Sequence, residues 1–414
     1  MPDDLAPFLP LKTTEMLKSV MQQYYAELDE VSRSGHRPIA WCTSQGPVEL
    51  LRAMGFLVYF PENHGSLLGT TRRAMDFIGL ANSIGYSPDI CSYVTSDIGA
   101  FLAGETPLKE VYRVSGVPHP DVLVYNNNQC RDVQEWFEYY ARQIGVPVMG
   151  IRTPRGVGEV SPHMISGVAR QMETLAEHLA PIAKQTLNLN TFCETVERSK
   201  QSSDLWKSIL EMAGHRPSPI TFTDVCLHMG PAVNLRGTDT AVSYYQVLSK
   251  EVAYRVKHRA GAIRNERFRI YWEGMPIWGK LRFFAETMAR MHVSLVASTY
   301  GHSWVFDAFD PNDPFTSTAR AYTALFTVRH ERFKESFLME MLRKFQIDGI
   351  IFHNSRTCPN CNNSQYGMPR RLSEKTRIPH LILDGDLNDL RCFSEEQTLT
   401  NLEAFVEMLA QRGV

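Results

Sequence analysis

The hydrophobic positions along the chain follow two different rhythms. Between Thr14 and Ser34 they recur at helical spacing among many polar residues, which predicts an amphipathic helix. From residue 36 to about residue 160, short apolar runs alternate with helical stretches. The expected strands there are 38–43, 56–60, 121–125 and 146–151, and the expected helices are 47–54, 70–84, 91–102 and 131–143. This alternation predicts a mostly parallel sheet covered by helices on both faces.

The rhythm changes again in the second half of the chain. Residues 161–265 show long helical patterns without strands, which indicates a helical connecting region. The alternation then returns between residues 266 and 414, with strands expected at 269–272, 293–298, 349–353 and 380–383. The fold class is therefore α/β, with an N-terminal helix (1–35), a first domain (36–160), the connecting region (161–265) and a second domain (266–414).

Composition narrows the range of functions. The 414 residues are 43% hydrophobic and carry a formal net charge of -2, so a basic surface for nucleic acid is not expected. Residues 1–12 lack the basic start and apolar run of a signal peptide, and no 18 apolar residues run together, so neither secretion nor a membrane span is expected. We expect a cytoplasmic protein. No Walker loop or GxGxxG motif is present, so no nucleotide site is expected in this chain.

Three of the eight cysteines occupy the same kind of position. Cys91, Cys130 and Cys358 each lie where a turn leads into a helical stretch. In open α/β sheets such turns lie at the edge where ligands bind, and helix N-termini favour thiolates. Three thiolates would leave one iron of a 4Fe-4S cluster open, because a closed cluster normally takes four cysteines. The spacing alone also admits buried core cysteines, which is the interpretation favoured for Cys42, Cys193, Cys226 and Cys392.

Cys361 forms a CxxC pair with Cys358, which raises two alternatives. A zinc site would need a second ligand pair at finger spacing, and the sequence has none. A thioredoxin-like thiol pair would be expected in a much smaller domain.

Several stretches together resemble the benzoyl-CoA reductase and 2-hydroxyacyl-CoA dehydratase family, over nearly the whole chain. They are SPDICSYVTSDIG (87–99), NNNQC (126–130), NLRGTD (234–239), EGMPIW (273–278), HNSRTC (353–358) with Gln365, and LDGDLND (383–389). The resemblance implies two related subunits, each with two Rossmann-like, doubly wound domains and a 4Fe-4S cluster between them. It assigns the cluster ligands to Cys91, Cys130 and Cys358, whereas Cys361 has no usual counterpart.

The resemblance also implies a reaction and partners. A separate ATP-hydrolysing iron-sulfur activator would supply single low-potential electrons, so that ATP binds the activator and not this chain. The acyl-CoA substrate would pass through a ketyl radical, which calls for a dry cavity and a placed proton donor. Family dehydratases place a serine and a carboxylate beside the thioester, and the matching positions are Ser44 and Glu62. The alternative role of Ser44 is to cap the helix that begins at Pro47, and the alternative for Glu62 is an acidic residue in a solvent-exposed loop.

Three more residues are candidates for the same cavity. His302 and Trp304 follow an expected strand, and His302 has a side chain suited to proton donation near neutral pH. Trp278 is a candidate for packing against the acyl group. Each also has a purely structural interpretation: His302 as a histidine whose ring nitrogens are hydrogen-bonded within the fold, and the two tryptophans as aromatic residues of the core.

Three functions follow from the resemblance. The first is the core subunit of a benzoyl-CoA reductase-type enzyme that reduces an aromatic acyl-CoA, favoured by the segments 309–315 and 234–239. The second is a subunit of a (R)-2-hydroxyacyl-CoA dehydratase, favoured by Ser44 with Glu62. The third is a non-catalytic partner that relays electrons, which a fourth ligand such as Cys361 would favour.

Overall fold

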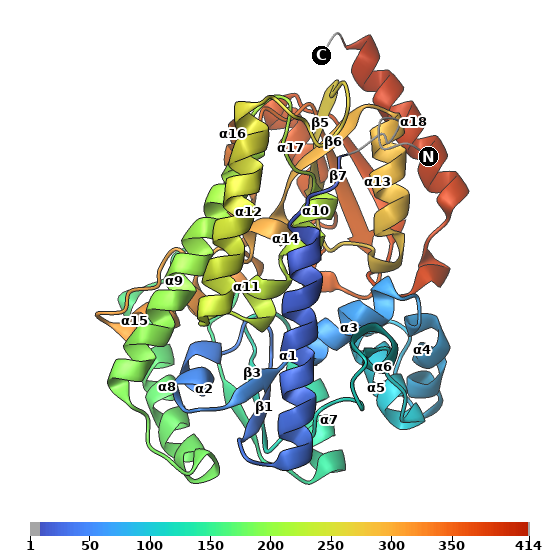
Figure 1. Cartoon of the computed structure of the whole chain (residues 1–414). Coiled ribbons are helices and arrows are strands. Elements are labelled where there is room, and N and C mark those ends of the chain that lie inside the picture. The colour runs from blue at the N-terminus through green and yellow to red at the C-terminus, as the bar shows by residue number, and fades with distance from the viewer. Residues whose placement is uncertain (1–8, 413–414) are drawn as a thin grey trace.

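The computed structural model describes residues 9–412 and contains two parallel four-stranded sheets (Figure 1). The first has the order β2-β1-β3-β4 and the second the order β6-β5-β7-β8. Their bounds are β1 Ile39–Cys42, β2 Leu57–Tyr59, β3 Val122–Asn126, β4 Val148–Ile151, β5 Phe268–Glu273, β6 Val293–Ser298, β7 Gly349–Ser355 and β8 His380–Gly385. The predicted α/β class with two Rossmann-like sheets is confirmed. The strand order reverses between the two central strands of each sheet, β1 and β3 in the first and β5 and β7 in the second. Ligands bind at such a reversal, beyond the carboxyl ends of the strands.

Helices pack around each sheet, which explains why most of its strands are apolar along their whole length. The first sheet is accompanied by α2 Val48–Ala53, α3 Pro61–Thr70, α4 Ala74–Ser83, α5 Ser92–Ala103, α6 Leu108–Tyr112 and α7 Asp132–Ile144. The second is accompanied by α13 Leu281–Arg290, α14 Thr299–His302, α16 Glu331–Lys344, α17 Met368–Thr376 and α18 Glu395–Gln411, whereas α15 Pro314–Thr323 packs on the helices α8 and α9 described next.

A helical layer joins the two halves. It consists of α8 Pro162–Ala183, α9 Leu189–Met212, α10 Phe222–His228, α11 Gly230–Asn234 and α12 Asp239–Lys257, together with the N-terminal α1 Thr14–Ser34. Helices α9 and α12 lie side by side, and α1 packs on β1, α11 and α12 (Figure 1). The predicted N-terminal helix is confirmed between Thr14 and Ser34, while residues 1–8 of the predicted 1–35 segment lie outside the described residues.

Helix α3 was not expected from the sequence. Its glycines lower helix propensity, but they allow close packing. A Cβ at Gly65 would lie 3.0 Å from the Tyr93 ring, and one at Gly69 would lie 2.8 Å from Trp278 Cβ. As a result, Glu62 lies in the first turn of a helix and not at the end of a strand.

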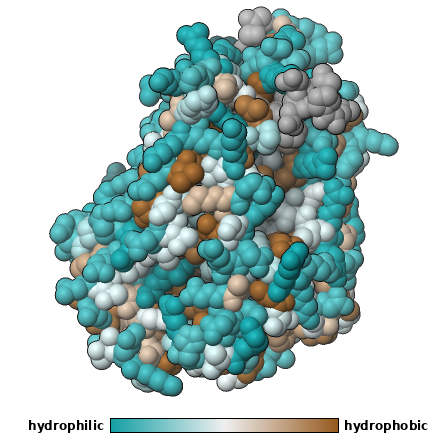
Figure 2. All heavy atoms as spheres, in the orientation of Figure 1, coloured by the Kyte–Doolittle hydropathy of each residue, from teal (hydrophilic) through white to brown (hydrophobic). Residues whose placement is uncertain are grey.

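Within residues 9–412, none of the helices combines the length and apolar character needed to cross a bilayer. The face shown in Figure 2 is mostly hydrophilic, with apolar residues in small separate spots.

Candidate functional site

A cavity of about 210 Å³ lies between the two sheets and is lined by residues from both halves of the chain. Its walls are largely apolar, with a few polar groups and five thiols, one of which belongs to Cys226, a buried residue that was predicted to be part of the core. The lining residues used below are Ser44, Glu62, Cys91, Tyr93, Gln129, Cys130, Glu273, Trp278, Tyr300, Trp304, Cys358, Cys361 and Asn363. An enclosed apolar cavity with a few converging polar groups is typical of a small-molecule site.

The cysteines reach this cavity from three turns. Cys91 directly precedes α5, Cys130 lies two residues before α7, and Cys358 directly precedes the 3₁₀ helix η4 (Pro359–Cys361). Burial raises the pKa of the Cys91 and Cys130 thiols, that of Cys130 to about 12, although backbone N–H groups at the starts of α5 and α7 counteract it. Metal binding at these thiols must therefore displace their protons.

Thiolates are the usual ligands of iron-sulfur clusters. Among residues 9–412, no three His, Cys, Asp or Glu side chains lie close enough together to hold one metal ion. In an iron-sulfur cluster each cysteine binds a different iron, so the sulfurs stand further apart than the ligands of one ion. Cys91, Cys130, Cys358 and Cys361 all line one cavity, so their donor chemistry fits such a cluster.

Cys358 and Cys361 belong to the same corner of the cavity. A hydrogen bond between the two thiols raises the pKa of Cys358 and lowers that of Cys361, and Lys334 also lowers the pKa of Cys361. The thiols of Cys358 and Cys361 are therefore in contact with each other, and both residues line the cavity at the position predicted for the third ligand.

Ser44 and Glu62 are brought together, as the resemblance implies. The backbone N–H of Ser44 donates to the Glu62 carboxylate, and Ser44 Oγ lies 3.5 Å from Asn63 Oδ1. Ser44 does not cap α2, whose first turn has no side-chain cap. Burial raises the pKa of Glu62, and hydrogen bonds from Ser44 and Gln129 partly offset the effect. A buried carboxyl group of this kind is suited to proton transfer.

A second buried carboxyl group, Glu273, was missed in the sequence. It ends β5, and its two carboxylate oxygens accept hydrogen bonds from Thr299 Oγ1 and Asn363 Nδ2. Burial raises its pKa to about 7, against the effect of these donors. An acidic residue at the carboxyl end of an otherwise buried strand was the available signal.

Of the three further candidates for the cavity, the two tryptophans line it and His302 does not. Trp278 and Trp304 line the cavity, and Trp278 Nε1 donates to the Tyr93 hydroxyl. His302 is not among the lining residues: its Nδ1 lies 2.8 Å from the carbonyl oxygen of Ser298, and its ring packs edge-on against Phe345. Burial lowers the pKa of His302 to about 4. The structure therefore does not bring His302 to the cavity, because α14 turns Tyr300 toward the cavity instead.

The segments that favoured the reductase lie outside the cavity lining. Phe309 packs against Phe306 and Tyr322 in the core. Arg236, from the 234–239 segment, binds Glu49 Oε1 at 2.9 Å and the carbonyl oxygen of Ser44 at 3.2 Å. Neither segment therefore contributes to the lining that would face the acyl group.

The sequence is similar to one protein family and to several named subunits over nearly its whole length. The family described as "2-hydroxyglutaryl-CoA dehydratase, D-component" matches residues 43–409. The alpha subunit of (R)-2-hydroxyisocaproyl-CoA dehydratase from Clostridioides difficile is 28% identical, over 96% of this chain and 96% of its own length. The alpha subunit of lactoyl-CoA dehydratase from Anaerotignum propionicum is 27% identical (95% and 96%), and a benzoyl-CoA reductase subunit from Thauera aromatica is 25% identical (97% and 96%).

Proposed function

Because the chain belongs to the 2-hydroxyglutaryl-CoA dehydratase D-component family, we propose that it is the cluster-binding subunit of a (R)-2-hydroxyacyl-CoA dehydratase. The family supports a subunit of an enzyme of the 2-hydroxyacyl-CoA dehydratase or benzoyl-CoA reductase type. The observation that carries the finer proposal is the placement of Ser44 and Glu62 at the same cavity as the cysteines, with Glu62 close enough to Cys130 to raise the pKa of that thiol.

In this proposal Cys91, Cys130 and Cys358 hold a 4Fe-4S cluster. When bound, the cluster supplies single electrons and, with three thiolate ligands, an open iron. Side chains of this chain bind the substrate, transfer the proton and exclude water. The Ser44 hydroxyl binds the thioester carbonyl, and the Glu62 carboxyl group delivers a proton to the departing hydroxyl oxygen, as elimination of water requires. Trp278, Tyr300 and Trp304 exclude water from the acyl group.

The partners follow from the relatives. Each of those named above is itself described as one subunit of its enzyme, so we expect a second, homologous cluster-binding subunit here. The ATP-dependent iron-sulfur activator and the cytoplasmic location remain predictions from the sequence.

A benzoyl-CoA reductase-type subunit is the second candidate. The Thauera aromatica relative is matched over as much of the chain as the dehydratases, and the same cysteines would serve the reduction. The electron-relaying subunit rests on Cys361, whose thiol would close the cluster.

The test is anaerobic purification with the partner subunit, followed by measurement of iron and sulfide and by turnover with a 2-hydroxyacyl-CoA or benzoyl-CoA in the presence of the activator. We expect about four irons per chain, lost in Cys91→Ala and Cys358→Ala but kept in the matched control Cys361→Ala, and consumption of the 2-hydroxyacyl-CoA. Consumption of benzoyl-CoA alone would instead favour the reductase. An iron-free chain that holds one zinc ion would overturn the proposal.

A further inference from the structure

We infer that Asp386 is a positioning residue that clamps the Cys91 turn to the Cys358 turn, so that these two ligand positions are set before a cluster is bound. The inference rests on the proposed cluster and adds a residue to its assembly. Asp386 follows β8 and is fully buried, and it lies outside the cavity lining.

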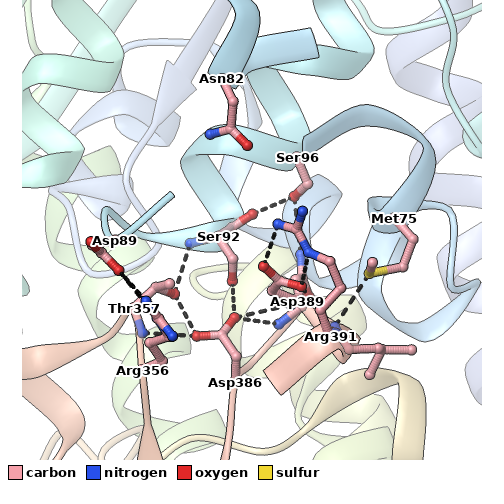
Figure 3. Close-up of polar contacts among 12 residues, drawn as sticks. Met75, Asn82, Asp89, Ser92, Ser96, Arg356, Thr357, Asp386, Asp389 and Arg391 are labelled. Atoms are coloured by element: carbon pink, nitrogen blue, oxygen red, sulfur yellow. Dashed lines mark hydrogen bonds and ion pairs between the residues drawn. The ribbon is translucent and has the colours of Figure 1, made fainter. Parts of the chain in front are cut away.

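Both oxygens of the Asp386 carboxylate are engaged (Figure 3). Oδ1 accepts hydrogen bonds from Ser92 Oγ and from the backbone N–H groups of Asn388 (3.1 Å) and Asp389 (3.0 Å). Oδ2 accepts from the backbone N–H of Thr357 at 2.9 Å and from Thr357 Oγ1 at 2.6 Å. The start of α5, where Ser92 lies, adds a favourable helix dipole for this buried charge.

Three residues from outside the Asp386 turn donate to its carboxylate: Ser355 Oγ donates to Oδ2 at 3.4 Å, and the other two, Ser92 and Thr357, are direct neighbours of cysteines. Ser92 follows Cys91 in the first half of the chain, and Thr357 precedes Cys358 in the second half. They also bind each other, because the backbone N–H of Ser92 donates to Thr357 Oγ1 at 3.0 Å. One carboxylate therefore holds two ligand turns that come from different halves of the chain.

The third ligand turn is attached to this network within the first half. Asp132, two residues after Cys130, accepts a hydrogen bond from the backbone N–H of Cys91 at 3.4 Å. Hydrogen bonds thus link the Cys130 turn to the Cys91 turn, and the Cys91 turn to the Cys358 turn. Loss of the Asp386 contacts would free the Cys358 turn to move relative to the other two, and a cluster would then dissociate more easily.

The experiment measures the loss of iron to a ferrous chelator from the anaerobically purified full chain, followed by the visible absorbance of the cluster. Thr357→Val keeps the size of the side chain but removes its hydroxyl, and Asp386→Asn removes the charge. We expect each to lose iron about tenfold faster than the wild type, equivalent to about 1.4 kcal/mol, and Thr357→Ser to restore the wild-type rate. Asp384→Asn is the matched control, since Asp384 is exposed and its carboxylate accepts from Asn354 Nδ2 at 2.6 Å.

Rescue by Thr357→Ser separates positioning from general stability, and the Thr357 pair keeps the test decisive if Asp386→Asn does not fold. Iron loss at the wild-type rate from Thr357→Val, even with a lowered unfolding midpoint in urea, would overturn the role of Asp386. A wild-type chain that takes up no iron would overturn the proposed function itself.

Discussion

Arg236→Met removes the cation beneath the Ser44 turn, and its effect on stability follows from the contacts. The Arg236 guanidinium donates to Glu49 Oε1 at 2.9 Å and to the Tyr322 hydroxyl at 2.9 Å. The side chains of Arg236 and Glu49 are 2% and 0% exposed, so water cannot take the place of Arg236 beside Glu49. Without Arg236, Glu49 keeps hydrogen bonds from Ser199 and Tyr322 but loses its hydrogen-bonded cation, and Arg52 acts on it only through space.

Breaking a buried ion pair by removing one partner costs about 3–5 kcal/mol. The whole free energy of unfolding of a protein is roughly 5–15 kcal/mol. With a urea dependence of about 3 kcal/mol per molar, the midpoint of unfolding should fall by about 1–2 M. The assay is urea denaturation followed by tryptophan fluorescence.

The matched control is Arg131→Met, because Arg131 pairs with Glu135 while both side chains are exposed (86% and 59%). Its free energy of unfolding should change by less than about 1 kcal/mol. Adding Glu49→Gln to Arg236→Met should recover part of the loss, since no uncompensated charge then remains buried. A midpoint shift for Arg236→Met no larger than that for Arg131→Met would refute this reasoning.

Three further changes test the cavity. Glu62→Gln should lower kcat by about 10²–10⁴-fold while the iron content stays at the wild-type level; unchanged turnover would remove Glu62 from the mechanism. His302→Gln should leave turnover unchanged, because this side chain lies outside the cavity lining, and a large loss would contradict its placement. The pKa of Glu273 is raised from 4.5 to about 7, so the folded state binds this proton more tightly than the unfolded chain. The free energy of unfolding should therefore fall by about 3 kcal/mol as the pH rises from about 4.5 to 7, and Glu273→Gln should remove that contribution. Urea titrations of both proteins across this range measure it, and identical pH dependence would show that Glu273 is not the group involved.

Much of the fold was predictable because local hydrophobic periodicity reports which face of each element is buried. All eight strands and helix α1 lie where that periodicity places them. Helix α3 was missed because its glycines serve tertiary contacts with Tyr93 and Trp278, which no local pattern reveals. Because α3 was not predicted, the position of Glu62 in the first turn of a helix was not predicted either.

Local patterns were sufficient to predict the α/β class and the turns that carry the cysteines, and family resemblance was sufficient to select Ser44 and Glu62 as candidates. The packing of distant elements was needed to show that His302 lies outside the cavity lining, that Glu273 lies within it and that Asp386 joins two cysteine turns. A spacing along the chain places a residue on an element, whereas the partners of that residue come from elements far away in sequence. Ser92 and Asp386, 294 residues apart, meet because the two sheets pack with their ligand-binding edges toward each other.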